Sequence, residues 1–279
     1  QYILSRFSDE DISYDALLWL ARIYNEEGKF ADAKMIFDQL EGDREFPRRL
    51  KRELEVVYSD YYVKQKEYED AIPRIRKAID LARKRKDKAR YKYILAQIYQ
   101  NLEEYNKASV LYGEVVKLNP PYEMAFNAKI NRAEAFSSGS GDVREIKRQL
   151  QKMLRDDKNI EYQDQIYFAL ANIVFKEGNI DQAIEYYRES ARSSVSNPNQ
   201  QALSYLKLAD IYFSMPNYPN AQQFYDSTMT FLSTDYPKYD EISVKTKYLN
   251  ELIENLNMVH FQDSVQELAA LPQKEIDKI

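Results

Sequence analysis

Residues 95–112 read LAQIYQNLEEYNKASVLY, and the same arrangement of small and aromatic residues returns along the chain. In each copy a small residue directly follows an apolar one. Counted from that small residue, a large residue comes three positions later and an alanine twelve positions later. The small residues are Ala21, Ser59, Ala96, Ala171 and Ala209. Successive copies lie 38, 37, 75 and 38 residues apart, so the longest interval conceals one further copy.

The concealed copy falls on Ala133 and Phe136, which occupy the small and the large position. The apolar residues of its second half keep helical spacing but arrive one residue late, and the loop at 137–142 absorbs the difference. These residues are Ile146, Leu150 and Met153. The chain therefore holds six copies, of which the fourth, at about 126–160, is degenerate.

This pattern resembles the tetratricopeptide-repeat (TPR) template, in which paired helices cross at small residues and aromatic side chains wedge between neighbouring repeats. The resemblance implies an all-α, right-handed superhelical solenoid of about six helical pairs over residues 14–239. Residues 1–13 are then the end of a preceding helix or a linker. The usual period is ~34 residues, so each copy here is longer by about one helical turn. We expect the second helix of each pair to contain that turn.

A final apolar stripe follows the repeats within residues 240–279. Its spacing predicts a capping helix from Asp240 to Val259 that closes the end of the solenoid. The stripe consists of Ile242, Leu249, Leu252, Ile253, Leu256 and Val259. A short helix is expected next, and it should break near Pro272. Its inward-facing residues are Val265, Leu268 and Ala269.

The composition is that of a folded helical protein and excludes several classes of function. The net charge is −5, which disfavours nucleic acid as a partner, and there is no cysteine. No apolar run approaches the ~18 residues that a membrane-spanning helix requires. Gln1 and Ile279 are expected to be cuts in a longer protein, or a processed start.

The sequence contains no recognisable catalytic constellation, so we expect neither enzymatic activity nor a cofactor or metal. His260 is the only histidine, which excludes a Ser-His-Asp arrangement and favours a structural or surface role for it. The Gly139-Ser140-Gly141 cluster lacks the Lys-Ser/Thr pair of a phosphate-binding loop and fits a flexible turn.

The concave groove of such a solenoid is the natural binding surface, and first helices line it through positions i, i+3, i+7 and i+10. The candidate partner-binding residues are Arg22, Tyr93, Gln97, Phe168, Asn172, Phe175, Asp210 and Phe213. Equally, Phe175 and Phe213 could pack against neighbouring first helices. The clamp by which some TPR proteins hold a chaperone's terminal carboxylate is excluded, because Leu18 and Arg22 stand where lysine and asparagine are needed.

One basic run is the strongest local charge feature. Two interpretations are open: a solvated end of a lengthened second helix, where cations complement the helix dipole, or a docking patch for an acidic partner surface. Its basic residues are Arg83, Lys84, Arg85, Lys86, Lys88 and Arg90.

Several segments resemble a narrower family. They are Asn119–Asn127, Leu208–Phe213, Tyr225–Ser227, Asp235–Tyr239 and Gln262–Ala269. Together they are similar to the PorW/SprE family of Bacteroidetes, TPR lipoproteins of the type IX secretion and gliding machinery. The similarity covers most of the chain and is most specific in about the last 80 residues.

The resemblance implies a periplasmic scaffold, tethered to the outer membrane, that links the ring complex of the secretion machine to its translocon. The lipidated cysteine of the family would then precede Gln1. An alternative is a cytoplasmic TPR adaptor or regulator that binds a peptide in its concave groove. A third class, an enzyme domain, is nearly excluded by the missing catalytic constellation.

Overall fold

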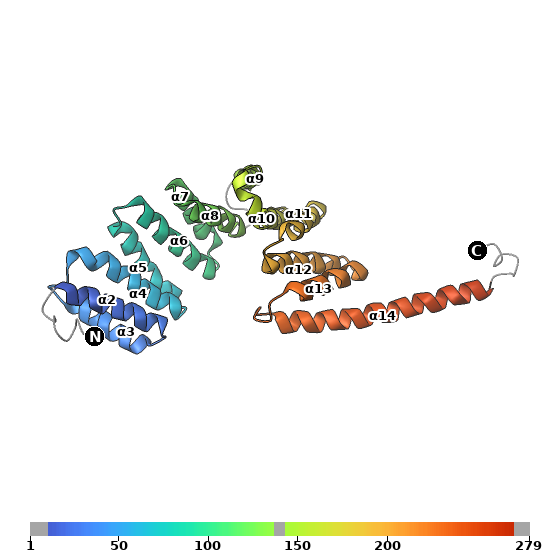
Figure 1. Ribbon diagram of the computed structural model, residues 1–279, viewed down its shortest axis with the longest axis horizontal. Helices are drawn as coiled ribbons and strands as arrows, with labels where there is room; N and C mark the ends of the chain where they lie inside the picture. The colour runs from blue at the N-terminus through green and yellow to red at the C-terminus, as the bar shows by residue number, and fades with distance from the viewer. Residues whose placement is uncertain (1–10, 137–142, 271–279) are drawn as a thin grey trace. The chain divides into compact units, whose positions relative to one another are not determined.

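The computed structural model describes residues 11–136 and 143–270, and every regular element in these ranges is helical (Figure 1). The chain forms two compact units, Gln1–Gln149 and Leu150–Ile279, which are described separately. The boundary between them lies inside the helix α9 (Val143–Leu154) of the fourth repeat.

The first unit is built from pairs of helices joined by short turns. A single 3₁₀ turn, Arg48–Leu50, precedes α4. The helices that lie wholly in this unit are α2 (Asp11–Glu26), α3 (Phe30–Gly42), α4 (Lys51–Lys64), α5 (Tyr68–Leu81), α6 (Arg85–Asn101), α7 (Tyr105–Lys117) and α8 (Tyr122–Glu134).

The second unit repeats this design and ends in a long helix. A 3₁₀ segment, Asp157–Tyr162, leads into α10. The helices are α10 (Gln163–Lys176), α11 (Ile180–Ser193), α12 (Pro198–Ser214), α13 (Tyr218–Phe231) and α14 (Tyr239–Ala270).

Small residues sit at the crossing of each helix pair, as the repeat pattern predicts. The first-helix positions Ala21, Ala96, Ala171 and Ala209 are fully buried, and Ser59 is 2% exposed. The alanines that begin the second helices are also fully buried: Ala33, Ala71, Ala108, Ala183 and Ala221. Because a larger side chain would hold the helices apart, these positions fix the close approach on which the fold depends.

The turn within a pair uses one residue in the left-handed backbone region. In the first and fifth repeats that residue is glycine, with φ of +70° at Gly28 and +82° at Gly178. Lys66 and Glu103 adopt similar angles of +63° and +59° in the second and third repeats. A side chain is strained in this region, so glycine suits the turn better.

The second helices are not lengthened, so the prediction that placed the extra turn in them was wrong; among the first helices only α2, α6 and α12 are longer, and 3₁₀ segments precede α4 and α10 instead. The second helices α3, α5, α7, α9, α11 and α13 contain 12 to 14 residues. By contrast, α6 and α12 each contain 17. The basic run is affected, because α5 ends at Leu81 and α6 begins at Arg85. Its cations therefore stand at a helix N-terminus, where the dipole does not favour them.

The C-terminal prediction also needs correction, because α14 is one continuous helix of 32 residues. Ile242, Leu249 and Ile253 are buried as expected. Leu252, Leu256 and Val259 are instead 42%, 38% and 52% exposed. The residues expected to face inward from a separate short helix, Val265, Leu268 and Ala269, are exposed on the same helix. Pro272 lies outside the described residues.

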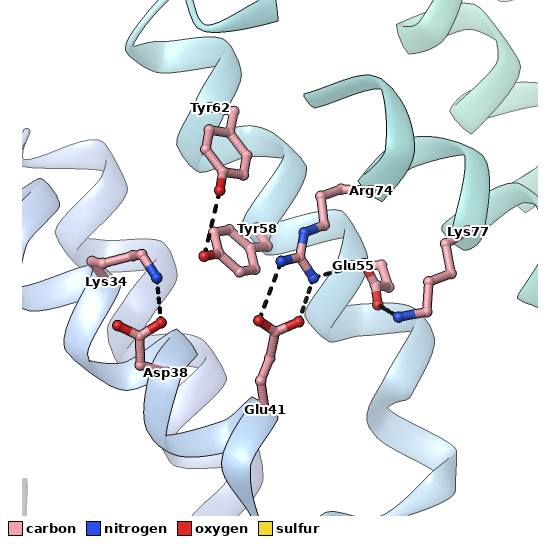
Figure 2. A network of polar contacts seen from close by, with 8 residues as sticks. All are labelled: Lys34, Asp38, Glu41, Glu55, Tyr58, Tyr62, Arg74 and Lys77. Carbon is pink, nitrogen blue, oxygen red and sulfur yellow. Dashed lines mark hydrogen bonds and ion pairs between the residues drawn. The ribbon is translucent and has the colours of Figure 1, made fainter. Parts of the chain in front are cut away.

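A network of charged and aromatic side chains joins the first two repeats (Figure 2). Glu55 is only 2% exposed, and its carboxylate pairs with Arg74 at 3.4 Å and with Lys77. Arg74 also pairs with Glu41 of α3 and lies 4.0 Å above the ring of Tyr58. The buried carboxylate is thus compensated by cations, as a charge in a protein interior must be.

Candidate partner-binding groove

The first helices of the first three repeats share one cavity of about 530 Å³. Three of the residues singled out in the sequence line it: Arg22 of α2, and Arg90 and Gln97 of α6. The other lining residues are Glu26, Glu53, Val56, Val57, Ser59, Asp60, Val63, Ile75, Tyr91 and Ile94. Arg22 and Gln97 of the expected stripe thus lie at one hollow with aliphatic and charged walls.

The two arginines of this cavity differ in what they contact. The guanidinium of Arg22 forms an ion pair with Glu53 and lies 4.7 Å from the ring centroid of Trp19. Arg90 is exposed and forms neither a hydrogen bond nor an ion pair with any residue that the structure describes. Arg90 is consequently the cation that this cavity offers to an incoming carboxylate.

A buried amide lies beneath the wall of the cavity. Asn25 is 1% exposed, and its Nδ2 donates to the Val57 carbonyl at 3.0 Å and to Asp60 Oδ2 at 3.2 Å. The Oδ1 atom of Asn25 is buried and accepts no hydrogen bond from any residue that the structure describes. Burial raises the pKa of the Asp60 carboxyl above its ordinary value, although the bond from Asn25 opposes the shift.

Asp60 is a groove residue that the sequence reading missed. It occupies the same position in the second repeat as Arg22 and Gln97 do in the first and third, one residue after the small residue. The repeat register contains the signal for Asp60, because the residue after the small Ser59 belongs to the same stripe.

Tyr93 does not line this cavity, because it packs toward the next repeat. Its hydroxyl accepts a hydrogen bond from Asn131 Nδ2 of α8 at 2.9 Å. Its ring meets that of Tyr112 edge-to-face, with 5.4 Å between centroids. Burial raises the pKa of Tyr93 above its ordinary value.

In the second unit the polar stripe residues are held by buried tyrosines. Tyr187 donates its hydroxyl proton to Asn172 Oδ1 at 2.6 Å, and Tyr225 does the same to Asp210 Oδ1 at 2.5 Å. The ring of Phe168 lies edge-on to Tyr187 at 5.5 Å. Because one lone pair of each acceptor is already used, these stripe positions are fixed in orientation and only partly available to a partner.

Phe213 contacts the two helices that follow it, through the rings of Tyr218 and Tyr225 in α13 and through Lys245 in α14. Lys245 of α14 places its ammonium 4.2 Å from the Phe213 ring centroid and 4.7 Å from that of Tyr225. The same ammonium lies 3.4 Å from Asp210. Phe213 remains 38% exposed and Phe175 is 42% exposed.

The basic run does not form one surface with the groove. Arg83 and Lys84 precede α6, Arg85 and Lys86 begin it, and of the six cations only Arg90 lines the cavity. Within this run, Asp87 forms an ion pair with Arg52 of α4 at 3.1 Å.

A second hollow, of about 580 Å³, lies among α5, α6 and α7. Ile79, Leu95 and Leu111 supply apolar surface to it, and its charged residues include the ion pair of Lys92 with Glu114. This hollow was not anticipated from the sequence, because its lining comes from three helices.

The described residues form neither a metal-binding cluster nor a membrane-spanning helix. Within residues 11–136 and 143–270, no group of three or more histidine, cysteine or acidic residues is arranged to hold a metal ion. No described helix is long and apolar enough to cross a membrane. His260 is exposed on the outer part of α14.

Comparison with known proteins supports the repeat assignment. Two tetratricopeptide-repeat models match, one at residues 15–42 and the other at 89–122 and 164–194. No curated protein sequence matches the chain significantly. The apo form of the quorum sensor NprR from B. thuringiensis is similar in structure, with 13% identity, a TM-score of 0.63, and 89% of this chain and 73% of that chain covered. NprR in complex with its cognate peptide NprX gives 13% identity, a TM-score of 0.52, and coverage of 99% and 88%. The chain thus contains tetratricopeptide repeats, and its fold is the all-helical TPR solenoid.

Proposed function

We propose that the protein is a non-catalytic scaffold that binds an extended protein segment in the groove of its first unit. The observation that carries the proposal is the cavity formed by α2, α4 and α6, in which the cation of Arg90 has no partner among the described residues. A segment with aliphatic side chains and one carboxylate would match the walls and the free guanidinium.

The structural neighbours support this proposal in general terms. NprR, whose fold is similar, has been solved with its cognate peptide. At 13% identity the likeness concerns the fold and does not transfer the binding residues. The residues of the groove must therefore be tested in this chain directly.

The resemblance to the PorW/SprE family gives the proposal a cellular setting. We infer that the protein is a periplasmic component of type IX secretion, tethered to the outer membrane, and that its partners are ring and translocon subunits. A solenoid presents a long surface, so it can bind two large partners at once and increase their effective concentration. The competing proposal is a cytoplasmic adaptor that binds a peptide in the same groove.

The decisive experiment is co-purification of the full-length protein from its native cell envelope. Ring and translocon subunits should be recovered with the wild type and lost with Arg90→Glu, which reverses the free charge of the groove. The matched control is Arg85→Glu, because Arg85 belongs to the same helix but lies outside the cavity.

Each outcome separates the proposals. Recovery from the cytosol without these subunits would defeat the secretion role and favour the adaptor. Equal loss with Arg85→Glu would indicate that net charge, and not the groove, controls binding. If the Arg90→Glu variant still bound the ring and translocon subunits, their binding site would lie outside this cavity.

A further inference from the structure

The second hollow lies among α5, α6 and α7, at the junction of the second and third repeats. The buried Ile79 and Leu95 and the half-buried Leu111 line it, together with Val110, which is 63% exposed. The hollow is internal to the first unit, because the described helices α4 and α8 follow on either side of it in the array. Its lining has no residue in common with the groove of α2, α4 and α6.

The sixth repeat shows which kind of side chain fills the equivalent place. Leu111 of α7 and Phe224 of α13 each come three residues after the alanine at the crossing of their helix. The ring of Phe224 stacks on that of Tyr212, with 5.5 Å between centroids. The guanidinium of Arg188, from α11, lies 5.8 Å from the Phe224 centroid and donates to the Tyr212 hydroxyl at 3.0 Å. A cation and a tyrosine thus both contact one aromatic ring.

The junction that forms the second hollow retains this cation and this tyrosine but lacks the ring. Tyr99 corresponds to Tyr212, three residues after the small residue, and Arg76 corresponds to Arg188, five residues after the crossing alanine. Arg76 donates to the Tyr99 hydroxyl at 2.8 Å. Because Leu111 is smaller than phenylalanine, the space that a ring fills in the sixth repeat is open here.

At the junction of the first two repeats, a long side chain occupies the same position (Figure 2). Arg74 stands three residues after the crossing alanine of α5. Its guanidinium lies 4.0 Å from the Tyr58 ring centroid and pairs with Glu41 and Glu55. Leucine, the smallest of the three side chains at this position, thus occurs where the hollow is found.

The charges around the second hollow favour an occupant that carries a carboxylate. Three basic and two acidic residues line it. Lys92 pairs with Glu114, and Lys107 pairs with Glu104, which is not part of the lining. Arg76 is exposed and forms no ion pair with any residue that the structure describes. An acidic residue beside an entering aromatic side chain would supply that pair.

We propose that the second hollow binds an aromatic side chain of a partner protein, which stacks on Tyr99 beside Arg76. The partner residue next to this aromatic side chain is acidic and pairs with Arg76. The Lys107 ammonium lies 5.1 Å from the Tyr99 centroid, but its side chain is 57% exposed, so its displacement costs little. Because the two linings are distinct, the proposal does not depend on a peptide in the groove.

The probe is the peptide acetyl-Gly-Asp-X-Gly-amide, in which X is para-fluorophenylalanine. On titration with the whole chain, its fluorine resonance should shift and broaden in a saturable manner, because the ring enters the hollow against Tyr99. A peptide with trifluoroleucine at X has the same charge but no ring. Its fluorine resonance should respond far less.

Three variants locate the binding of this peptide. Leu111→Phe should abolish it, because the chain's own ring then takes the place that Phe224 has in the sixth repeat. The same variant should raise the Tm, since it fills a hollow. Arg76→Leu should weaken binding about fivefold. Arg188→Leu is the matched control, because it removes the equivalent cation of the sixth repeat, and it should leave the titration unchanged. Circular dichroism of each variant verifies that the fold is retained.

Several results would overturn the proposal. One is a fluorine resonance that does not respond, as it would not if another part of the chain already filled the hollow. Another is an equal response of the trifluoroleucine peptide. Binding that survives Leu111→Phe, or a lowered Tm of that variant, would show that the place does not accept a ring. If Arg76→Leu bound as tightly as the wild type, or no more weakly than Arg188→Leu, the contact would not involve this guanidinium.

Discussion

At the scale of single residues, the alanines at the helix crossings are the positions that tolerate least change. Ala183 is fully buried at the start of α11, where the repeat pattern placed it. Ala183→Phe should overpack the crossing and lower the free energy of unfolding by about 1–3 kcal/mol. Ala31→Phe is the control, because Ala31 is exposed in α3. Chemical denaturation measures both, and equal stabilities would refute the assignment of Ala183.

The carboxyl of Asp164 predicts a pH effect on stability. It is 1% exposed and accepts hydrogen bonds from the Gln165 amide at 2.8 Å, from Asn197 Nδ2 at 3.1 Å and from Ser194 Oγ at 3.3 Å. Burial raises the pKa of Asp164 above its ordinary value. The folded state therefore binds this proton more tightly than the unfolded state. Protonated Asp164 therefore stabilises the fold fully at pH values below its pKa in the unfolded state. This stabilisation is lost as the pH rises through its pKa in the folded state.

Asp164→Asn removes that titration while retaining the shape of the side chain. Between about pH 4 and pH 7, the Tm of the wild type should fall relative to that of the variant. Paired thermal melts across this range provide the measurement. Parallel curves would show that Asp164 has the same proton affinity in both states.

The groove residues show how far single positions can be read from a sequence. Repeat register predicts Arg22 and Gln97 on the groove stripe, and both line one cavity, together with Arg90 of the basic run. The bonds that orient Asn172 and Asp210 were not foreseen, because their tyrosine partners lie fifteen residues away on another helix. Spacing along one helix cannot report a contact that depends on how two helices cross.

At the scale of helices, the start of α6 is poorly capped. Lys84 has the extended backbone of an N-cap, with φ −88° and ψ 137°, but its side chain forms no capping bond. In the second unit, Asn179 and Asn197 accept capping bonds from Gln182 and Gln200. Lys84→Asp should supply the missing acceptor, favour the helix dipole and stabilise the protein by about 1 kcal/mol.

The control for this substitution is Lys84→Ala, which removes the same charge but provides no acceptor. Denaturant titration of both variants separates the cap from the charge. If alanine stabilised the protein as much as aspartate, repulsion among the cations and not the missing cap would be the cause.

The same helix explains why its boundary could not be predicted. The run from Arg83 to Arg90 contains no capping side chain at its start and no glycine or proline to end the preceding helix. Cations are typical of helix C-termini, so local rules assigned this run to the wrong helix.

A second element-scale prediction concerns the joint between α3 and α5. Arg74→Met should leave the buried Glu55 with Lys77 as its remaining cation and remove the pair with Glu41. We expect a loss of about 2 kcal/mol. The double variant Arg74→Met/Glu55→Gln should recover part of it, because the buried charge is then absent. Calorimetry of the two proteins tests this, and no recovery would show that Arg74 acts through its stacking on Tyr58.

At the scale of the whole molecule, the sequence repeats predict the fold class correctly. They do not predict the structure of the C-terminal helix α14. The two helices of each repeat cross at small residues, and the spacing of these residues can be read directly from the sequence. Periodicity in α14 correctly indicated an amphipathic helix, but it could not reveal whether a partner covers each turn. Ile253 is buried and Leu256, one turn further, is 38% exposed.

The outer part of α14 therefore has a different thermodynamic character from the repeats. From Glu254 to Ala270 every residue is exposed, so these turns rest on local hydrogen bonds and side-chain propensities alone. Helices of this length are marginal in water without support, and their population declines smoothly with temperature. Amide protons beyond Ile253 should exchange with deuterium far faster than those of the buried turns, in a gradient that steepens toward Ala270. On warming, this segment should melt as a peptide does, gradually and first, while the repeats are still intact.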